Sequence, residues 1–173
     1  MTAIDNTPYN KNFLSPLNFN FYLKRAPHVN FFVQSVNLPG FGFTSPIQTD
    51  PFTNIPQPGD RLRFEDLEVT FKVDEELQNY LEIANWLRGL GFPESFTEYA
   101  QLKAAIPGSG AETTSDITLL ISNAIKVPKY EVQFRNAFPI NLSRLNFQTT
   151  DETVNYISAT ATFKYILYDI KQI

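Results

Sequence analysis

The stretch RLRFEDLEVTFKVDEELQNYLEIANWLRGL, residues 61–90, changes from one hydrophobic period to another. Over residues 67–73 every second residue is apolar, which is typical of a strand with one buried face. These residues are Leu67, Val69, Phe71 and Val73. From Leu77 the apolar spacing becomes that of a helix, which Asp74 is predicted to cap and Gly89 to end. The stretch therefore predicts a strand leading directly into an amphipathic helix.

The predicted helix has more apolar surface than packing on one sheet requires. We expect the face formed by Leu77, Leu81 and Ala84 to pack on the sheet of the same subunit. The other apolar residues are surplus to that contact, and we predict that they meet another subunit. They are Tyr80, Ile83, Trp86 and Leu90.

The composition also favours an assembly. Of the 173 residues, 43% are hydrophobic, 14% are aromatic and only 18% are charged. Such a chain either has a very large core or buries further surface against partners. A net charge of −4 argues against a nucleic-acid groove, which needs clustered Lys and Arg. The chain has no cysteine, so neither a disulfide framework nor a thiolate metal site is expected.

The first half of the chain predicts an irregular arm, a β-hairpin and a long loop. Residues 1–16 are polar and contain prolines, as expected of an arm. The apolar patterns over 17–24 and 30–38 predict two strands that pair as a hairpin. No secretory signal pattern begins the sequence, and no apolar run is long enough to cross a membrane. We therefore expect a soluble protein made in the cytoplasm.

The segment 41–60 is rich in proline and yet apolar. Proline has no backbone donor, so the segment is predicted to be a long loop, or at most an edge strand or β-hairpin arm. Long loops in compact domains are usually functional. We predict that its apolar residues contact another subunit. They are Phe41, Phe43, Ile47, Phe52 and Ile55.

The second half of the chain predicts a short helix and further strands. The helix is expected over 95–105, inside a segment 92–115 that looks like an insertion and contains a Pro-Gly-Ser-Gly loop. Strands are expected over 116–123, 130–135, 142–149 and 156–168, with an acidic turn before the last. With about seven strands, the fold class is predicted to be mainly β (α+β), an antiparallel sandwich or barrel with one flanking helix. A single domain is expected over 17–173.

Residues for catalysis are sparse. His28, the single histidine, is expected in a solvated turn and has no second histidine or cysteine with which to bind zinc or form a nucleophilic pair. Glu65 and Glu68 could pair for acid–base hydrolysis, but a charged strand start explains them better. We therefore expect no enzyme, no cofactor and no metal site.

Several motifs resemble the tail tube proteins of contractile-tailed bacteriophages. They are the Leu-Pro-Gly turn at 38–40, the Pro-Gly-Asp at 58–60 and the acidic helix start at 74–76. The resemblance extends over about residues 17–169 and includes the aromatic-Pro turn and long closing strand near the end. It implies a β-sandwich or barrel whose subunits form six-fold rings that stack into a hollow tube. It also implies that loop 41–60 reaches the next ring.

The resemblance further implies partners and a location. The rings would contact sheath, baseplate and tape-measure proteins, DNA would pass through the lumen without sequence-specific binding, and no membrane would be bound. The protein would be part of the virion, made in the host cytoplasm. A repeating tube subunit and a tube-like ring at the baseplate remain open, and type VI secretion tubes share the architecture.

Two other functions remain open from the residues alone. A carbohydrate- or receptor-binding module of a tail or baseplate would use exposed Tyr22, Tyr99 and Tyr156 as stacking platforms. A hydrolase would use Glu65 and Glu68.

Overall fold

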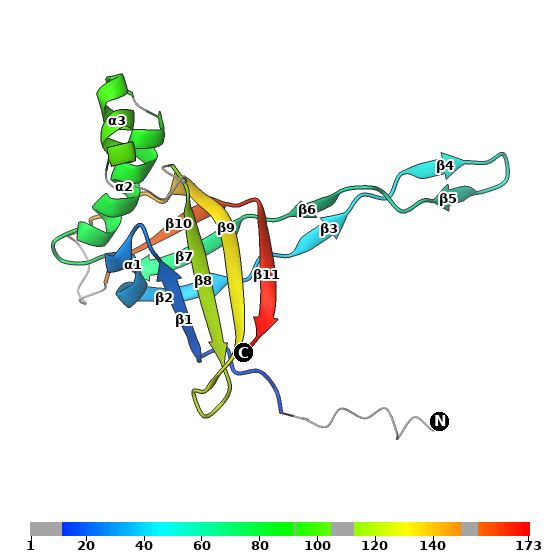
Figure 1. The fold of residues 1–173 in the computed structure, drawn as a ribbon, viewed down its shortest axis with the longest axis horizontal. Coiled ribbons are helices and arrows are strands. Elements are labelled where there is room, and N and C mark those ends of the chain that lie inside the picture. Colours follow the sequence, from blue (N-terminus) through cyan, green and yellow to red (C-terminus); the bar gives the residue numbers. More distant parts are fainter. Residues whose placement is uncertain (1–11, 92, 105–112, 150–155) are drawn as a thin grey trace.

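The mainly β class predicted from the sequence is confirmed (Figure 1). The computed structural model describes residues 12–91, 93–104, 113–149 and 156–173. Its helices are α1 (Pro27–Phe32), α2 (Gln78–Gly91) and α3 (Phe96–Ala104). Its strands are β1 (Phe19–Leu23), β2 (Val33–Asn37), β3 (Phe41–Phe43), β4 (Ile47–Thr49), β5 (Asn54–Pro56), β6 (Leu62–Phe64), β7 (Leu67–Lys72), β8 (Ser115–Ser122), β9 (Pro128–Leu142), β10 (Ser158–Lys164) and β11 (Leu167–Gln172). Most of the predicted N-terminal arm, the Pro-Gly-Ser-Gly loop and the acidic turn lie outside the described residues.

Two antiparallel sheets share the long strand β9. One has the order β1-β8-β9-β11 and the other the order β9-β10-β7-β2. Residues 130–135 of β9 pair with β11, whereas residues 138–142 pair with β10. Between these parts Asn136 has a φ of 53° and its amide donates to Asp116 Oδ1 at 3.0 Å. This left-handed residue marks the bend at which the strand passes from one sheet to the other.

The core lies between the two sheets and α2. Leu67, Val69 and Phe71 of β7 are fully buried, as their alternation predicts. Beside them β10 contributes small alanines and the buried Phe163. The ring of Trp86 from α2 packs on Phe163 with the ring centroids 6.2 Å apart. The helix therefore completes the same core that the central strand begins.

The inward face of α2 is different from the predicted one. Ile83 and Trp86 are 0% and 2% exposed within the subunit itself, whereas Leu77 and Leu81 are 36% and 48% exposed. The sequence placed Leu77 and Leu81 inward and kept Ile83 and Trp86 for a partner, and this division is wrong. Both faces have helical spacing, so periodicity alone could not separate them.

The start of α2 explains which face turns inward. The helix begins at Gln78, and Leu77 before it has a φ of 59°, so Asp74 does not cap the helix as predicted. Instead the fully buried side chain of Asn79 accepts from the Asp74 amide at 3.2 Å and donates to the Lys72 carbonyl at 2.8 Å. These bonds fix the helix to the end of β7.

Gly89 lies inside α2 and does not end it, which corrects a second prediction. A Cβ at Gly89 would lie 3.0 Å from Cβ of Leu102, so the glycine lets α3 approach closely. The second helix predicted over 95–105 is confirmed as α3, and it lies beside α2 (Figure 1). None of the helices in the described ranges is long and apolar enough to cross a bilayer.

The predicted hairpin of strands 17–24 and 30–38 is wrong. β1 pairs with β8 and β2 pairs with β7, and α1 connects the two sheets. Pro27 occupies the start of α1, where its missing donor costs nothing. The amide of Asn30 then binds the end of β1 by accepting from Leu23 N at 2.8 Å and donating to Leu23 O at 3.3 Å.

The predicted division of the last strands is also wrong. A loop was expected at 138–139, but β9 continues through it to Leu142, and no strand follows over the described residues up to 149. Pro139 is tolerated because the pairing with β10 shifts register between Thr162 and Phe163. The single closing strand predicted over 156–168 is two strands, β10 and β11, which pair with different parts of β9.

Candidate assembly surfaces

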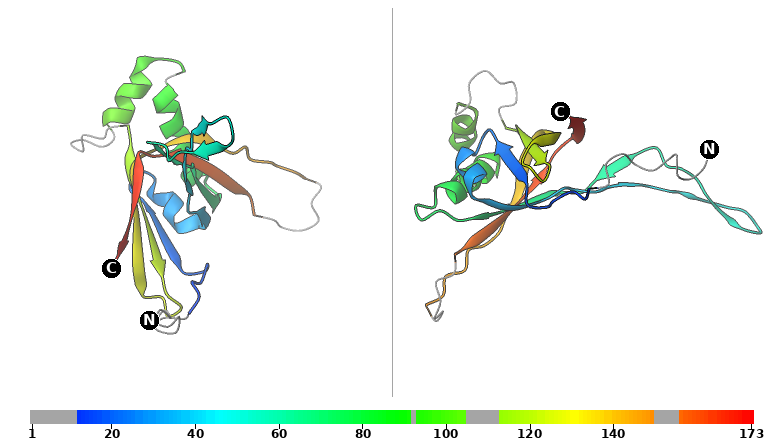
Figure 2. Two further views of the ribbon diagram at one scale, coloured as in Figure 1. Left: turned by 90° about the vertical axis from the view of Figure 1, so that its right-hand side faces the viewer. Right: turned by 90° about the horizontal axis from the view of Figure 1, so that it is seen from below.

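A long β-hairpin projects from the two sheets (Figure 2). We call residues 41–64 the arm. At its base β3 pairs with β6, and toward its tip β4 pairs with β5. The turn is closed by the Asp50 amide, which donates to Thr53 O at 3.0 Å. The β-hairpin form that the sequence left open for this segment is therefore present.

A short section that belongs to neither strand pair connects β3–β6 with β4–β5 in the arm. There the Ser45 hydroxyl donates to Gln57 O at 2.8 Å, and the Gln57 amide donates to Pro46 O at 2.9 Å. A Cβ at Gly59 would lie 2.0 Å from Thr44 O, so only glycine allows the strands to come this close. The Pro-Gly-Asp motif thus has a backbone role in the arm.

The apolar residues of the arm are exposed. Phe52 at the tip is 96% exposed and Ile47 is 63% exposed, and Phe41, Phe43 and Ile55 are also exposed. A two-stranded hairpin has no third layer under which either face could be buried. These five residues, which the sequence assigned to contacts with another subunit, thus remain available for that role.

The sheet edges form a second candidate surface. Within the described residues, β1 and β11 each pair on one side only, and they are the two edges of the sheet β1-β8-β9-β11. Ile170 of β11 is 54% exposed. Unpaired strand edges are templates for pairing with another chain. Sequence reasoning missed β11 because hydrophobic period does not reveal which strand is an edge.

The residues of α2 that were assigned to contacts with another subunit differ in how far they are buried. Ile83 and Trp86 lie in the core, and Tyr80 and Leu90 are partly buried against it. The hydroxyl of Tyr80 donates to Ser143 O at 3.2 Å. The exposed apolar residue of this helix is Leu81, which the sequence had placed inward. α2 is therefore mainly an element of the subunit's own core.

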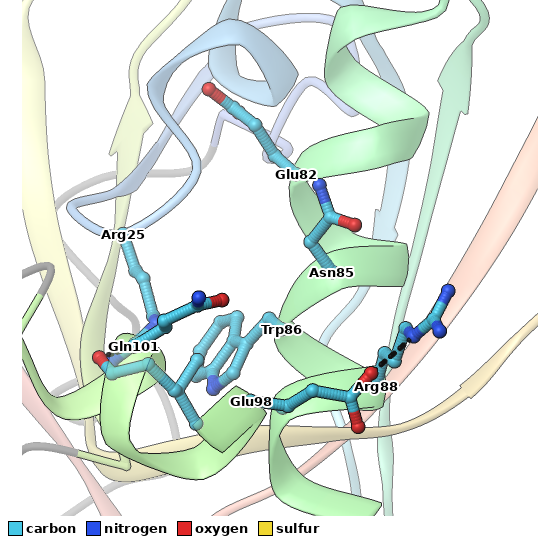
Figure 3. A pocket seen from close by; sticks show the side chains of 9 residues that line it. Arg25, Glu82, Asn85, Trp86, Arg88, Glu98 and Gln101 are labelled. Carbon is cyan, nitrogen blue, oxygen red and sulfur yellow. Dashed lines mark hydrogen bonds and ion pairs between the residues drawn. The ribbon is translucent and has the colours of Figure 1, made fainter. Parts of the chain in front are cut away.

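An open pocket of about 600 Å³ lies between α2, α3 and the end of β1 (Figure 3). Arg25 lies over the Trp86 ring at 5.0 Å and donates to Leu102 O at 3.0 Å. Glu98 accepts from Arg88 at 2.7 Å, and this bond lowers the pKa of the Glu98 carboxyl. A general acid near neutral pH needs a raised pKa, so the Glu98–Arg88 pair is better explained as a contact that stabilises the fold than as part of a catalytic site.

Glu82 extends away from the other pocket carboxylate, toward α1 (Figure 3). There His28 Nδ1 lies 2.5 Å from Glu82 Oε1, and this contact raises the pKa of His28. His28 is exposed to solvent as predicted, but it belongs to α1 and not to a turn, and it pairs with Glu82. In the part of the chain that the structure describes, no cluster of His, Asp or Glu could hold a metal ion.

The residues of the alternative functions are not assembled into one site. Glu65 Oε2 accepts from the Gly40 amide at 3.2 Å, while Glu68 accepts from Asn37 at 3.4 Å. Both carboxylates thus have structural partners. The three candidate stacking tyrosines lie on β1, on α3 and ahead of β10, and lysines lie over the rings of Tyr156 and Tyr99.

Solved structures with a similar fold include chains of a baseplate, a tube cap and a sheath–tube complex. A chain of the anti-feeding prophage baseplate matches at TM-score 0.59 and 11% identity, over 88% of this chain and 90% of its own. A chain of the cap that terminates the anti-feeding prophage tube matches at TM-score 0.58 and 14% identity over 100% of both chains. A chain of the extended sheath–tube complex of an extracellular contractile injection system matches at TM-score 0.57 and 14% identity over 94% of both. No protein-family model matches the sequence, and no curated protein matches it significantly.

The fold implied by the sequence resemblance is therefore confirmed. Nearly the whole chain follows the fold shared by these tube, cap and baseplate structures. At such low identity the likeness defines an architecture, and the role of this chain rests on its own surfaces.

Proposed function

We propose that this chain is a non-enzymatic structural subunit of a contractile tail-like assembly, which closes into rings and stacks them into a tube or a tube-like baseplate ring. The observation that carries the proposal is the arm. It bears large exposed apolar side chains, and toward its tip β4 and β5 form a separate two-stranded sheet. Exposing these apolar side chains to water costs free energy. Burying them against a second copy would recover that free energy.

Ring closure would use the edges of the sheet β1-β8-β9-β11. Its two edges belong to opposite sides of one sheet, so β11 of one copy can pair with β1 of the next in a heterologous contact. Six such contacts would close a ring and leave no edge of this sheet unpaired. Closure would thereby remove the aggregation risk of open strands.

Stacking would use the arm. Because the arm extends beyond the two sheets (Figure 2), its tip can reach a copy that the sheet edges do not touch. The residues assigned to this contact are Phe41, Phe43, Ile47, Phe52 and Ile55. The similar structures, which include a sheath–tube complex, a cap and a baseplate, support assembly with sheath and baseplate proteins.

The specific forms that the sequence resemblance implies are a bacteriophage tail tube or a tube-like ring at the baseplate, both in the virion, with a tape-measure protein among the partners and DNA passing through the lumen. The low content of basic residues agrees with a wall that does not hold phosphates. An extracellular contractile injection particle would use the same ring and arm contacts, without DNA. Mass spectrometry and nucleic-acid staining of purified particles would separate these two settings.

The test is negative-stain electron microscopy and sedimentation of the purified protein. We expect hexameric rings or tubes for the wild type and for Phe52→Leu, which keeps an apolar tip. Phe52→Asp should leave rings but prevent their stacking, because a carboxylate would be buried at the contact. A wild-type protein that stays monomeric at high concentration would overturn the proposal.

A further inference from the structure

The base of the arm is held by an aromatic cluster that joins it to the rest of the subunit. Phe64 of the arm packs 5.6 Å from the Tyr168 ring and 6.0 Å from the Tyr165 ring, measured between centroids. Phe41, on the other arm strand, lies 6.3 Å from Tyr168. Both tyrosines also pack on Phe134 of β9, at 5.0 Å and 5.3 Å. The cluster therefore connects both arm strands with the sheet.

The two tyrosine hydroxyls bind the backbone of the arm base. Tyr165 donates to Glu65 O at 2.8 Å, and Tyr168 donates to Pro39 O at 3.0 Å. Pro39 precedes β3 and Glu65 follows β6, so one hydroxyl binds each end of the arm. Because both ends are held, the arm cannot rotate as a unit about a single attachment point.

The two ends of the arm are also bonded to each other. The Glu65 amide donates to Gly40 O at 3.0 Å, and the Gly40 amide donates to Glu65 Oε2 at 3.2 Å. Beside them Lys164 Nζ lies 2.8 Å from Asp66 Oδ1. The two ends of the arm are thus hydrogen-bonded to each other next to the first residue pair of β3 and β6, Phe41 with Phe64.

The Tyr165 hydroxyl keeps its proton well beyond neutral pH. Burial raises the pKa of Tyr165 to about 12, with smaller contributions from Tyr168, Asp66 and Glu65. The hydroxyl is therefore protonated at neutral pH and can donate to Glu65 O.

We propose that Tyr165 and Tyr168 are positioning residues that hold the arm in one direction in the free subunit, so that the arm is oriented before it meets another copy. An isolated two-stranded hairpin is marginally stable and would otherwise sample many directions. Ordering it in advance removes that entropic cost from association. The inference rests on the proposed function only for the use that is made of the oriented arm.

The absence of cysteine makes the direction of the arm measurable. Thr53→Cys at the tip and Lys129→Cys on β9 place two spin labels on exposed positions. Double electron–electron resonance in an excess of unlabelled protein then reports distances within one chain, whether or not rings form. We expect a single narrow distance distribution for this background. Adding Tyr165→Phe with Tyr168→Phe should broaden it, because both hydroxyl bonds are lost.

Two controls keep the result specific. Tyr22→Phe changes a half-exposed tyrosine on β1 away from the arm and should leave the distribution narrow. Phe64→Ala removes ring contacts at the arm base and should broaden it even where the hydroxyls remain. Fluorescence of the buried Trp86 during thermal unfolding checks that each variant keeps its core.

The outcomes are separable from the proposed function. A broad distribution in the background protein, or one that stays narrow in the double tyrosine variant, would overturn the inference. If the distribution is narrow and tyrosine-dependent but electron microscopy finds no rings, the proposed function fails and the positioning role stands.

Discussion

Helix α2 and the arm are both rich in large apolar side chains, and the subunit treats them in opposite ways. On α2 the indole of Trp86 is 2% exposed, whereas the Phe52 ring at the tip of the arm is 96% exposed. Ile83 and Ile47 form the same contrast, at 0% and 63%. The side chains are similar, so the difference comes from the elements that carry them.

A helix has one stripe that can turn toward a sheet, and α2 has a sheet beside it. Toward its tip the arm is a separate two-stranded sheet, β4 with β5, so neither of its faces has a further sheet to pack on. Apolar composition therefore indicates that a segment has surface to bury. The architecture decides whether that surface is buried within the subunit or left exposed for a partner. This contrast separates residues that stabilise the subunit from residues that are free to join it to others.

The largest effect is expected for Trp86→Ala. The substitution empties a core site beside Phe163 and leaves Thr113 O without the indole donor that lies 2.9 Å away. A loss of about 3–5 kcal/mol in the free energy of unfolding is expected, measured by urea denaturation. The exposed Phe96→Ala on α3 is the control and should change stability by less than about 0.5 kcal/mol. Should Trp86→Ala impair assembly while stability is kept, α2 would belong with the arm.

Asn79→Ala is expected to have a smaller effect on stability. It removes the two bonds that join α2 to the end of β7 and leaves the Asp74 amide and Lys72 carbonyl without their partner. The cost should be about 1–3 kcal/mol by the same denaturation measurement. Asn85→Ala on the exposed side of the same helix should be close to neutral. Equal costs at the two positions would contradict the role given to Asn79 in orienting the helix.

The pair Ile47→Ser and Ile83→Ser places one chemical change in both regions. At Ile83 the loss of buried methyl groups should destabilise the subunit by about 2–5 kcal/mol. At Ile47 the change in unfolding free energy should stay within about 0.5 kcal/mol, because the side chain is already in water. Sedimentation should then detect weaker association for Ile47→Ser. An arm variant that unfolds the subunit would remove the distinction.

The smallest effect is expected at the solvent-facing contact between α1 and α2. The Glu82 hydrogen bond and charge raise the pKa of His28 in the folded state above its usual 6.5. The protonated form is thus favoured by folding, so its contribution is complete below the unfolded pKa and is lost as the pH rises through the folded pKa. His28→Gln should be slightly destabilising at about pH 6 and neutral at about pH 9 by thermal unfolding. His28→Lys keeps the charge and should remove this pH dependence, and a His28→Gln effect that persists at the higher pH would contradict the assignment.

Several features could be predicted because they are local. The alternation at Leu67, Val69 and Phe71 identified a half-buried strand, and the prolines of 41–60 excluded a central strand. The apolar residues of that segment also identified the arm as a candidate contact. The aromatic cluster at its base could not be predicted, because Tyr165 and Tyr168 are far from Phe41 and Phe64 in the sequence and meet them only in the folded chain.

Local patterns of apolar residues and prolines were enough to predict the central strand, the presence of α2 and α3, and an apolar segment that could form a hairpin arm. Four features follow from contacts between distant parts of the chain: the inward face of α2, the pairing of β1 with β8, the passage of β9 between two sheets and the free edges at β1 and β11. The physical reason is that a hydrophobic period specifies that a face must be buried but leaves its partner open. The partner is selected by contacts between distant residues, such as the bonds of Asn30 and Asn79 that end one element and orient the next.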